Sequence, residues 1–328
     1  MNRRSFLQMS TALMAQPILP SFAEGQGAGK KIYYGYGATG IGSSLGYEAM
    51  QVLREVAPEL DYEFVLEPGD NTIRASQIVK YAPANGDTLL QVNGTIMSLL
   101  SCLYRNLPYQ PLQDFIPVAF LGEYTYMFVV GQQVSKKVKT IDDYIDWVYE
   151  NPQYRDFGTV LYGSESHLAG LTLAYEKKIA LRAQAYGGTS LMVEDLLDGV
   201  LAAGFIATGN AAGAILSGRL RVLGVCSSER HKPMPDIPCF NELGVNNMNF
   251  RGWYGWVAPS DIDLNELLKI HRATNKMQES KKFKAMQKSF SLNQIQLSPN
   301  EILQRVIADT ERCEQLYQQF QLSRIDYV

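Results

Sequence analysis

The sequence predicts an α/β protein built of two lobes, between which the chain crosses twice. Strand-like and helix-like segments alternate from residue 30 to 104, and a second alternating series runs from 141 to 226. Such repetition is typical of parallel strands with helices on both faces of the sheet. The length of 328 residues favours two domains over one. Segments at about 121–130 and 250–258 are the candidate crossings between the lobes.

The first series consists of alternating predicted strands and helices. The strands are KKIYYGYG (30–37), DYEFVLE (61–67) and DTLLQVN (87–93). The helices are SSLGYEAMQVLREVAP (43–58), TIRASQIVKYA (72–82) and the buried TIMSLLSCLY (95–104). PVAFLGEYTYMFVVG (117–131) follows as one or two β segments.

The second series begins with the helix IDDYIDWVYEN, for which Thr140 is the predicted cap. Its strands are YRDFGTVLYG (154–163), ALRAQAYGG (180–188) and LRVLGVC (220–226), and its further helices are SHLAGLTLAYEKKI (166–179) and GNAAGAILSG (209–218). Between them lie TSLMVEDLLDG (189–199) and a short apolar run, VLAAGFIA (200–207). After the aromatic segment FRGWYGWVAPS, charged helices complete the chain, and two crossings place them back on the first domain.

The N-terminus has the layout of a bacterial signal peptide of the twin-arginine type. Arg3 and Arg4 precede a mildly apolar stretch, and Ser21-Phe22-Ala23 offers small residues for cleavage near Ala23. A disordered basic tail is the alternative. No other segment approaches ~18 uninterrupted apolar residues, so no transmembrane helix is expected. The mature protein is therefore expected to be soluble and exported to the periplasm.

A literal G-x-G-x-x-G, the dinucleotide-binding pattern, spans Gly35 to Gly40 behind a predicted strand. The acidic residue that such a site requires falls at Glu67, which lies 67 − 40 = 27 residues beyond Gly40. The usual spacing is ~20, and nicotinamide cofactors are scarce outside the cytoplasm. We therefore expect no cofactor. A glycine-rich turn before a helix exposes backbone N–H groups that suit a small anion such as a carboxylate.

Composition argues against several other functions. The net charge is −3 and no basic run follows the N-terminus, so nucleic-acid binding is not expected. His167, His231 and His271 are too scattered for a metal site, and the four cysteines match no zinc or redox spacing. Cys226 and Cys239 flank a loop that would allow a disulfide, and four buried thiols are the alternative.

Two α/β lobes, two crossings and export together describe a periplasmic binding protein. In open α/β sheets, ligands bind outside the carboxyl ends of the strands. The turns expected there are GYGATGIGSS, VNGT, LYGSESH and AYGGTS. The candidate ligand-binding residues on or beside them are Tyr36, Thr39, Gly40, Ile41, Gly42, Ser43, Asn93, Gly94, Thr95, Tyr162, Gly163, Ser164, Glu165, Ser166, Tyr186, Gly187, Gly188 and Thr189.

These turns and the sequence between them resemble the extracytoplasmic solute receptors of tripartite tricarboxylate transporters, the Bug-type family. ANGDTLLQVNGT is similar to that family's P-P-D-G-Y-T-L-L-x-x-x-N-G-T, and LYRNLPYQPLQDFIPVAFLG to its L-Y-x-x-L-P-Y-D-P-x-x-D-F-x-P-V. YGSESHLAG, YGGTSLMVEDLLDG, GRLRVLGV, MPDIPCFNELG and WYGWVAPS match further signatures in the same order. The resemblance covers about residues 31–328.

The resemblance implies a type II periplasmic-binding-protein fold: two α/β lobes joined by two crossing strands. A signal peptide (1–23) would precede a discontinuous domain 1 (24–125 and 248–328) that encloses domain 2 (126–247). It also implies a receptor without enzymatic activity, which hands a small organic acid to the membrane permease subunits of a tripartite transporter. We expect a monomer with no metal.

The predicted pocket departs from the common family pattern. A lysine usual at or beside Gly188 is missing, and Ile206-Ala207 stands where acidic residues are frequent. Tyr36, Tyr162 and Tyr186 near the turns favour an aromatic or longer, partly apolar carboxylate. The alternative is that these tyrosines face solvent or the hinge.

Residues on the turns also have structural interpretations. Ser164 is expected to cap the following helix as well as to contact ligand, and His167 to support that turn from within. Glu165 would repel a ligand carboxylate unless its side chain turned outward, where it favours the helix dipole. Residues 93–95 suit either ligand contacts or a structural turn with an N-cap, and both interpretations stay open.

Two other functional classes remain as alternatives. One is a receptor, ligand-sensing or without a ligand, that acts through a membrane signalling partner. The other is an exported α/β enzyme, although no G-x-S-x-G elbow with a matched acid and histidine occurs. Paired carboxylates are likewise missing from the predicted site turns.

Overall fold

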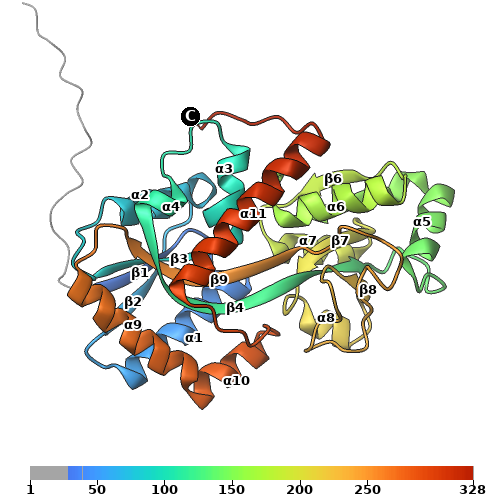
Figure 1. Ribbon diagram of the computed structural model, residues 1–328. Helices are drawn as coiled ribbons and strands as arrows, with labels where there is room; N and C mark the ends of the chain where they lie inside the picture. Colours follow the sequence, from blue (N-terminus) through green and yellow to red (C-terminus); the bar gives the residue numbers. More distant parts are fainter. Residues whose placement is uncertain (1–28, 39, 328) are drawn as a thin grey trace, which may run out of the picture.

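Figure 1 shows a computed structural model of the chain, which describes residues 29–38 and 40–327. The predicted signal peptide and Thr39 lie outside the described residues. Among the helices in the described ranges, none combines the length and the apolar composition that crossing a membrane requires.

The first lobe is built on a mixed sheet. β1 (Lys30–Tyr34), β2 (Tyr62–Leu66) and β3 (Thr88–Asn93) are parallel, in the spatial order β2-β1-β3. β9 (Arg251–Pro259) lies antiparallel beside β3, and β4 (Phe115–Val130) lies antiparallel beside β9. The parallel pairing predicted for the first series is confirmed for β1, β2 and β3, whereas the crossing strands β4 and β9, whose direction was not predicted, pair antiparallel. β9 enters this sheet from the second lobe, so it runs antiparallel to β3, which the chain reaches through a helix of the first lobe.

The second lobe is built on the continuation of β4. Residues 126–130 pair with β7 (Ala203–Ala207) and residues 127–130 with β8 (Arg221–Val225), both antiparallel. β5 (Asp156–Thr159) lies parallel between β7 and β6 (Arg182–Ala185). One 16-residue strand thus takes part in both halves of the sheet. The predicted domain boundaries at 125/126 and 247/248 stay predictions.

Helices pack on the sheet of the first lobe. α1 (Ile41–Val56) buries Leu45, Ala49, Val52 and Leu53, the spacing of one helical face. The other helical segments are η1 (Asp70–Thr72), α2 (Ile73–Lys80), η2 (Thr95–Leu99), α3 (Leu100–Leu103) and α4 (Pro111–Asp114). The C-terminal helices α9 (Leu264–Glu279), α10 (Lys281–Ser289) and α11 (Pro299–Gln319) return to this lobe, where they contact α1, β4 and η2 (Figure 1).

In the second lobe, α5 (Ile141–Glu150) starts at the predicted cap. The Thr140 hydroxyl accepts the Asp143 amide at 3.1 Å, and the Asp143 carboxylate accepts the Thr140 amide at 2.9 Å. This capping box confirms the prediction for Thr140. The remaining helices are η3 (Pro152–Tyr154), α6 (Glu165–Glu176), α7 (Thr189–Asp198) and α8 (Ala212–Leu216).

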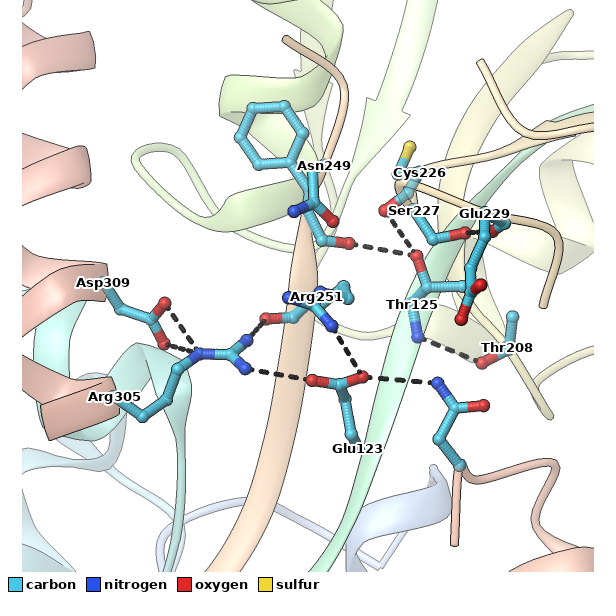
Figure 2. Close-up of polar contacts among 12 residues, drawn as sticks. Glu123, Thr125, Thr208, Cys226, Ser227, Glu229, Asn249, Arg251, Arg305 and Asp309 are labelled. Atoms are coloured by element: carbon cyan, nitrogen blue, oxygen red, sulfur yellow. Dashed lines mark hydrogen bonds and ion pairs between the residues drawn. The ribbon is translucent and has the colours of Figure 1, made fainter. Parts of the chain in front are cut away.

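A buried charge network joins the crossing strands to α11, as Figure 2 shows. Glu123 of β4 is 2% exposed and accepts hydrogen bonds from Arg305 at 2.9 Å and Arg251 at 3.3 Å. Arg305 also donates to both oxygens of Asp309, each at 2.9 Å. Removing one partner of such a network leaves a buried charge uncompensated, so the network fixes how these three elements meet.

Two residues further along β4, Thr125 contacts Cys226 and Phe250, which lie at the ends of the segment that leads from the second lobe back to the first. Its hydroxyl donates to the carbonyl of Cys226 at 2.6 Å, and it lies 3.1 Å from the carbonyl of Phe250 (Figure 2). Phe250 immediately precedes β9, the second crossing strand. The connection between the lobes is thereby held by side-chain contacts as well as by the ladder between β4 and β9.

All four cysteines are buried as free thiols. The Cys239 Sγ lies 3.8 Å from the carbonyl of Ser228, and Cys226 is fully buried beside β4. The alternative of four buried thiols is therefore the one that the structure shows.

Candidate functional site

The four predicted turns meet at one cleft between the lobes. Its volume is 600 Å³, and segments after β1, β2 and β3 of the first lobe and after β5, β6 and β7 of the second line it. These are carboxyl ends of strands, where open α/β sheets bind ligands. The predicted site residues that line the cleft are Tyr36, Gly40, Ile41, Gly42, Ser43, Asn93, Thr95, Tyr162, Ser164, Ser166, Tyr186, Gly187, Gly188 and Thr189.

The other predicted residues do not line this cleft. Gly94, Gly163 and Glu165 lie behind the lining, and Thr39 is outside the described residues. The Gly163 amide donates to Nδ1 of His167 at 3.0 Å, so His167 supports the turn from within. Burial lowers the pKa of His167 to about 4, which keeps its ring neutral and able to accept this bond at neutral pH.

Three described helices of eight residues or more begin at the cleft without a side-chain cap, α1, α2 and α7, and Asp70 lies two residues before the N-cap of α2. α1 starts after Gly40 and α7 after Gly188, and no described side chain caps either first turn. The φ of Gly40 is +114°, a conformation that favours glycine, and no heavy atom lies within 4 Å of where its Cβ would be. The first-turn amides and the positive end of the helix dipole are therefore available to an anion on each wall of the cleft.

α6 begins at the same cleft but satisfies its own first turn. The Ser164 hydroxyl donates to the Leu161 carbonyl at 2.6 Å and accepts the His167 amide at 3.4 Å. The hydroxyls of Ser166 and Thr159 lie 2.6 Å apart, and that of Ser164 lies 2.9 Å from Ser166. The capping role predicted for Ser164 is confirmed, while its contact with a ligand stays a prediction.

Glu165 turns inward. It is 7% exposed, and its Oε2 accepts hydrogen bonds from the Thr95 hydroxyl at 3.0 Å and the Tyr126 hydroxyl at 3.4 Å. The outward orientation considered from the sequence is therefore wrong, because this carboxylate finds donors inside the seam between the lobes. Burial raises its pKa above the usual range for a glutamate.

Gly94 explains how Glu165 fits. A Cβ at residue 94 would lie 2.9 Å from Oε1 of Glu165, closer than side-chain contacts normally come. The φ of Gly94 is −54°, so glycine is needed there for space rather than for conformation. The N-G-T turn therefore makes room for the Glu165 carboxylate and also contributes Asn93 and Thr95 to the lining of the cleft.

Seven tyrosines contribute to the walls of the cleft. The tyrosines of the lining are Tyr34, Tyr36, Tyr124, Tyr126, Tyr162, Tyr186 and Tyr254. Tyr34 and Tyr36 have ring centroids 5.1 Å apart, and Tyr124 and Tyr254 have theirs 5.0 Å apart. Burial raises the pKa of Tyr36 to about 12, so its hydroxyl stays protonated and can donate. Of the predicted tyrosines, Tyr162 is 51% exposed at the rim.

Sequence reasoning missed three parts of the lining. Tyr124, Tyr126 and Tyr254 lie on the crossing strands, the segment 68–72 follows β2, and Asn210 follows β7. The strand-end rule that selected the other turns also applies to 68–72. Three consecutive residues there, Asp70 to Thr72, have φ values of 46°, 54° and 73°. Such backbone strain in non-glycine residues is common at binding sites.

The cleft contains almost no formal charge. Asp70 is the one charged residue in the lining that the structure describes. The described residues also contain no group of three or more His, Cys, Asp or Glu suited to a metal ion. An anionic ligand would therefore depend on amides, hydroxyls and helix dipoles.

The family of the chain follows from comparison with known proteins. A model described as the tripartite tricarboxylate transporter family receptor matches residues 51–322. The chain belongs to this receptor family, as the sequence motifs predicted.

Curated relatives agree with this assignment. A UPF0065 protein in the tcbD-tcbE intergenic region of Pseudomonas sp. (strain P51) is 25% identical over 275 residues, 83% of this chain and 81% of the relative. Protein BugT of Bordetella pertussis (strain Tohama I) is 28% identical over 199 residues, 60% of each chain.

Solved structures share the fold. Rpa4515 of R. palustris with adipate has a TM-score of 0.82 at 20% identity, covering 90% of this chain and 98% of that one. The periplasmic binding protein BugD has a TM-score of 0.79 at 20% identity, with the same coverage. MatC from Rhodopseudomonas palustris with bound malate has a TM-score of 0.76 at 19% identity, covering 88% and 98%. The expected α/β fold of periplasmic binding proteins is confirmed.

Proposed function

We propose that this receptor binds a small organic carboxylate in the cleft between its lobes and delivers it to the membrane permease subunits of a tripartite transporter. The observation that carries the proposal is the pair of uncapped helix starts, α1 at Gly40 and α7 at Gly188, one on each wall. Their amides suit a carboxylate without requiring a cation. The adipate and malate named with Rpa4515 and MatC support the same ligand class.

The tyrosine-rich walls favour a ligand with an apolar body. Aromatic rings give apolar contact while their hydroxyls remain available as hydrogen-bond donors. An aromatic or longer, partly apolar carboxylate therefore suits the cleft, with its charged end at a helix start. Each lobe supplies only part of the contacts, so binding is expected to close the hinge formed by β4 and β9.

The test is a ligand screen on the mature chain. Mono-, di- and aromatic carboxylates are added in a thermal-shift assay, and each hit is measured by calorimetry. A binding ligand raises the melting temperature with concentration, because it stabilises the folded state alone. If no carboxylate binds the folded protein, the proposal fails and a receptor acting through a signalling partner is favoured. Copurified dinucleotide, flavin or stoichiometric metal would contradict the absence of a cofactor.

The proposal includes export of a monomeric receptor to the periplasm through the twin-arginine route, with cleavage near Ala23. Arg3 and Arg4 are the residues that this route requires. Replacing both by lysine is expected to leave the precursor in the cytoplasm, as fractionation would show. An unchanged periplasmic yield would contradict the route without affecting the ligand.

A further inference from the structure

Glu165 is surrounded by donors of the kind that bind a ligand carboxylate. The Thr95 and Tyr126 hydroxyls donate to Oε2 at 3.0 and 3.4 Å. These donors come from η2 in the first lobe and from β4. Thr95, Tyr126 and Glu165 are between 6% and 8% exposed. Two hydroxyl donors thus converge on one carboxylate oxygen in a buried place, so this is a built carboxylate position.

The Glu165 carboxylate lies at the partition between two cavities. Thr95 and Tyr126 line the cleft, whereas Glu165 lines a second cavity of 260 Å³. That cavity lies between α6 and α11, with Leu168 and Asp309 in its walls. A small solute therefore has a route to this position if the Glu165 side chain is removed.

The missing Cβ of Gly94 is a second sign that the position is adapted to a carboxylate. The Oε1 atom of Glu165 lies 2.9 Å from the position that a Cβ at residue 94 would take, closer than a Cβ contact normally comes. The indole nitrogen of Trp253 lies on the same side of Gly94 and has no hydrogen-bond partner among the described residues. The surroundings of Oε1 therefore include a further potential donor.

We propose that Glu165 fills one anion position of the cleft with a carboxylate of the chain itself, so that this receptor selects acids with one or two carboxylates over tricarboxylates. This inference rests on the proposed function. Of the described helices of eight residues or more that begin at the cleft, α1, α2 and α7 have uncapped first turns, whereas α6 is capped by Ser164. Asp70 lies two residues before the N-cap of α2, so a third ligand carboxylate would have to lie beside Asp70 or beside Glu165.

Occupied donors oppose a third ligand carboxylate. The Thr95 and Tyr126 hydroxyls are already engaged by Glu165, so a ligand group there would be buried without partners. Asp70, on the opposite lobe, adds negative charge to the lining and nothing in the described lining offsets it.

The first experiment is rescue of a vacated position by acetate. Glu165→Ala keeps the Thr95 and Tyr126 donors and leaves space, whereas Glu165→Gln keeps the volume filled and removes the carboxylate. We expect sodium acetate to raise the melting temperature of Glu165→Ala saturably, beyond the effect of sodium chloride at equal ionic strength. Wild type and Glu165→Gln should not respond. Equal acetate responses in all three proteins, or none in folded Glu165→Ala, would overturn the inference.

The second experiment needs no variant for its main result. Valerate, glutarate and tricarballylate share a five-carbon chain with one, two and three carboxylates, and benzoate, isophthalate and trimesate repeat the series on a ring. In whichever series binds, wild type is expected to bind the three-carboxylate acid at least ~100-fold more weakly than the better of the other two. Glu165→Ala should narrow this gap by ~10-fold, and Glu165→Gln should not, because its side chain still fills the space.

The outcomes separate this inference from the proposed function. If acids bind wild type and the three-carboxylate acid binds as tightly as the others, the function stands and the inference is wrong. If no acid binds wild type while acetate rescues Glu165→Ala, the carboxylate position is real and the proposed function fails. Without either binding or rescue, both fail.

Discussion

The first turns of α1 and α6 face the same cleft and are completed in opposite ways. α1 begins after Gly40, and no described side chain accepts a hydrogen bond from its first amides. α6 begins after Ser164, which caps it, and its first residue Glu165 brings a carboxylate to the same end. Both helix ends attract negative charge. The difference teaches that an exposed helix start is a ligand position only where the chain has not already supplied the anion.

Gly40 before α1 and Gly94 before η2 serve different needs. Gly40 has a φ of +114° and open space around its missing Cβ, so its role is conformational and it leaves the cleft free. Gly94 has a helical φ of −54°, and a carboxylate oxygen of Glu165 lies 2.9 Å from where its Cβ would be. Substitution at Gly40 should therefore affect ligand binding, whereas substitution at Gly94 should affect the stability of the folded chain.

The largest expected effect comes from filling the start of α1. Gly40→Val strains the backbone and places a side chain in the cleft, so affinity for the best carboxylate should fall by ~10- to 100-fold, or ~1.4–2.8 kcal/mol. Gly218→Val is the matched control, since Gly218 also has a positive φ (70°), open space at its Cβ and no part in the cleft lining. Calorimetry on both variants measures the loss of affinity. Equal losses would mean that backbone strain, and not the cleft, causes the effect.

The contrast at Gly94 is tested by a double-mutant cycle. Gly94→Ala should lower the free energy of unfolding by ~1–3 kcal/mol, because the new methyl group overlaps the Glu165 carboxylate. In a Glu165→Ala background the same change should become neutral or stabilise by up to ~1 kcal/mol, since alanine is the better helix former. Urea unfolding of the four proteins measures this. If Gly94→Ala changes the free energy of unfolding equally in both backgrounds, the glycine at residue 94 is not needed to make room for Glu165.

Much of the site could be predicted from the sequence because strand ends and helix starts have clear signals. Alternation of apolar segments placed the turns, and the rule on carboxyl strand ends brought them to one cleft. The same reasoning predicted the Thr140 and Ser164 caps, since short polar side chains before a helix compete for its first amides. The family motifs added the identity of the fold.

What the sequence did not reveal depends on contacts between distant segments. The inward turn of Glu165 requires donors at Thr95 and Tyr126, which are 70 and 39 residues away along the chain. The antiparallel direction of β9 follows from its entry out of the second lobe, which local periodicity does not report. The tyrosines of the crossing strands were likewise assigned to strands without an indication of which face meets the cleft.

A smaller, pH-dependent effect distinguishes two buried neighbours on α6. Burial raises the pKa of Glu165, so the stability linked to its neutral form is full below its unfolded pKa, ~4.3, and is lost as pH rises through the folded value. Burial lowers the pKa of His167 to about 4, so its contribution is present above ~6.5 and is lost as pH falls towards 4. The two linked contributions therefore change in opposite directions with pH.

Urea unfolding between pH 4 and 8 checks the sign for Glu165. Relative to Glu165→Gln, wild type should lose stability as pH rises from ~4.3. The groups near this carboxyl are Tyr36, Tyr124, Tyr126 and Tyr254, which titrate far above this range, and Asp309, which both proteins share. A difference between the two proteins that does not vary with pH would mean that Glu165 is ionised in the same way when folded and unfolded.

The smallest expected effect on binding is at Ser164, and it tests whether α6 is closed to the ligand. The Ser164 hydroxyl is engaged by the Leu161 carbonyl and the His167 amide, so Ser164→Ala should lower stability by ~0.5–2 kcal/mol as a lost cap. Its effect on affinity should stay below ~0.5 kcal/mol.

Thr189 lines the cleft at the start of uncapped α7. Thr189→Val keeps the shape and removes the hydroxyl, so it should weaken binding by ~0.5–1.5 kcal/mol with little change in stability. Calorimetry and urea unfolding on both variants give the two readouts. If Ser164→Ala weakens binding more than Thr189→Val does, the ligand uses the start of α6 after all, and the contrast between the two helix starts does not hold.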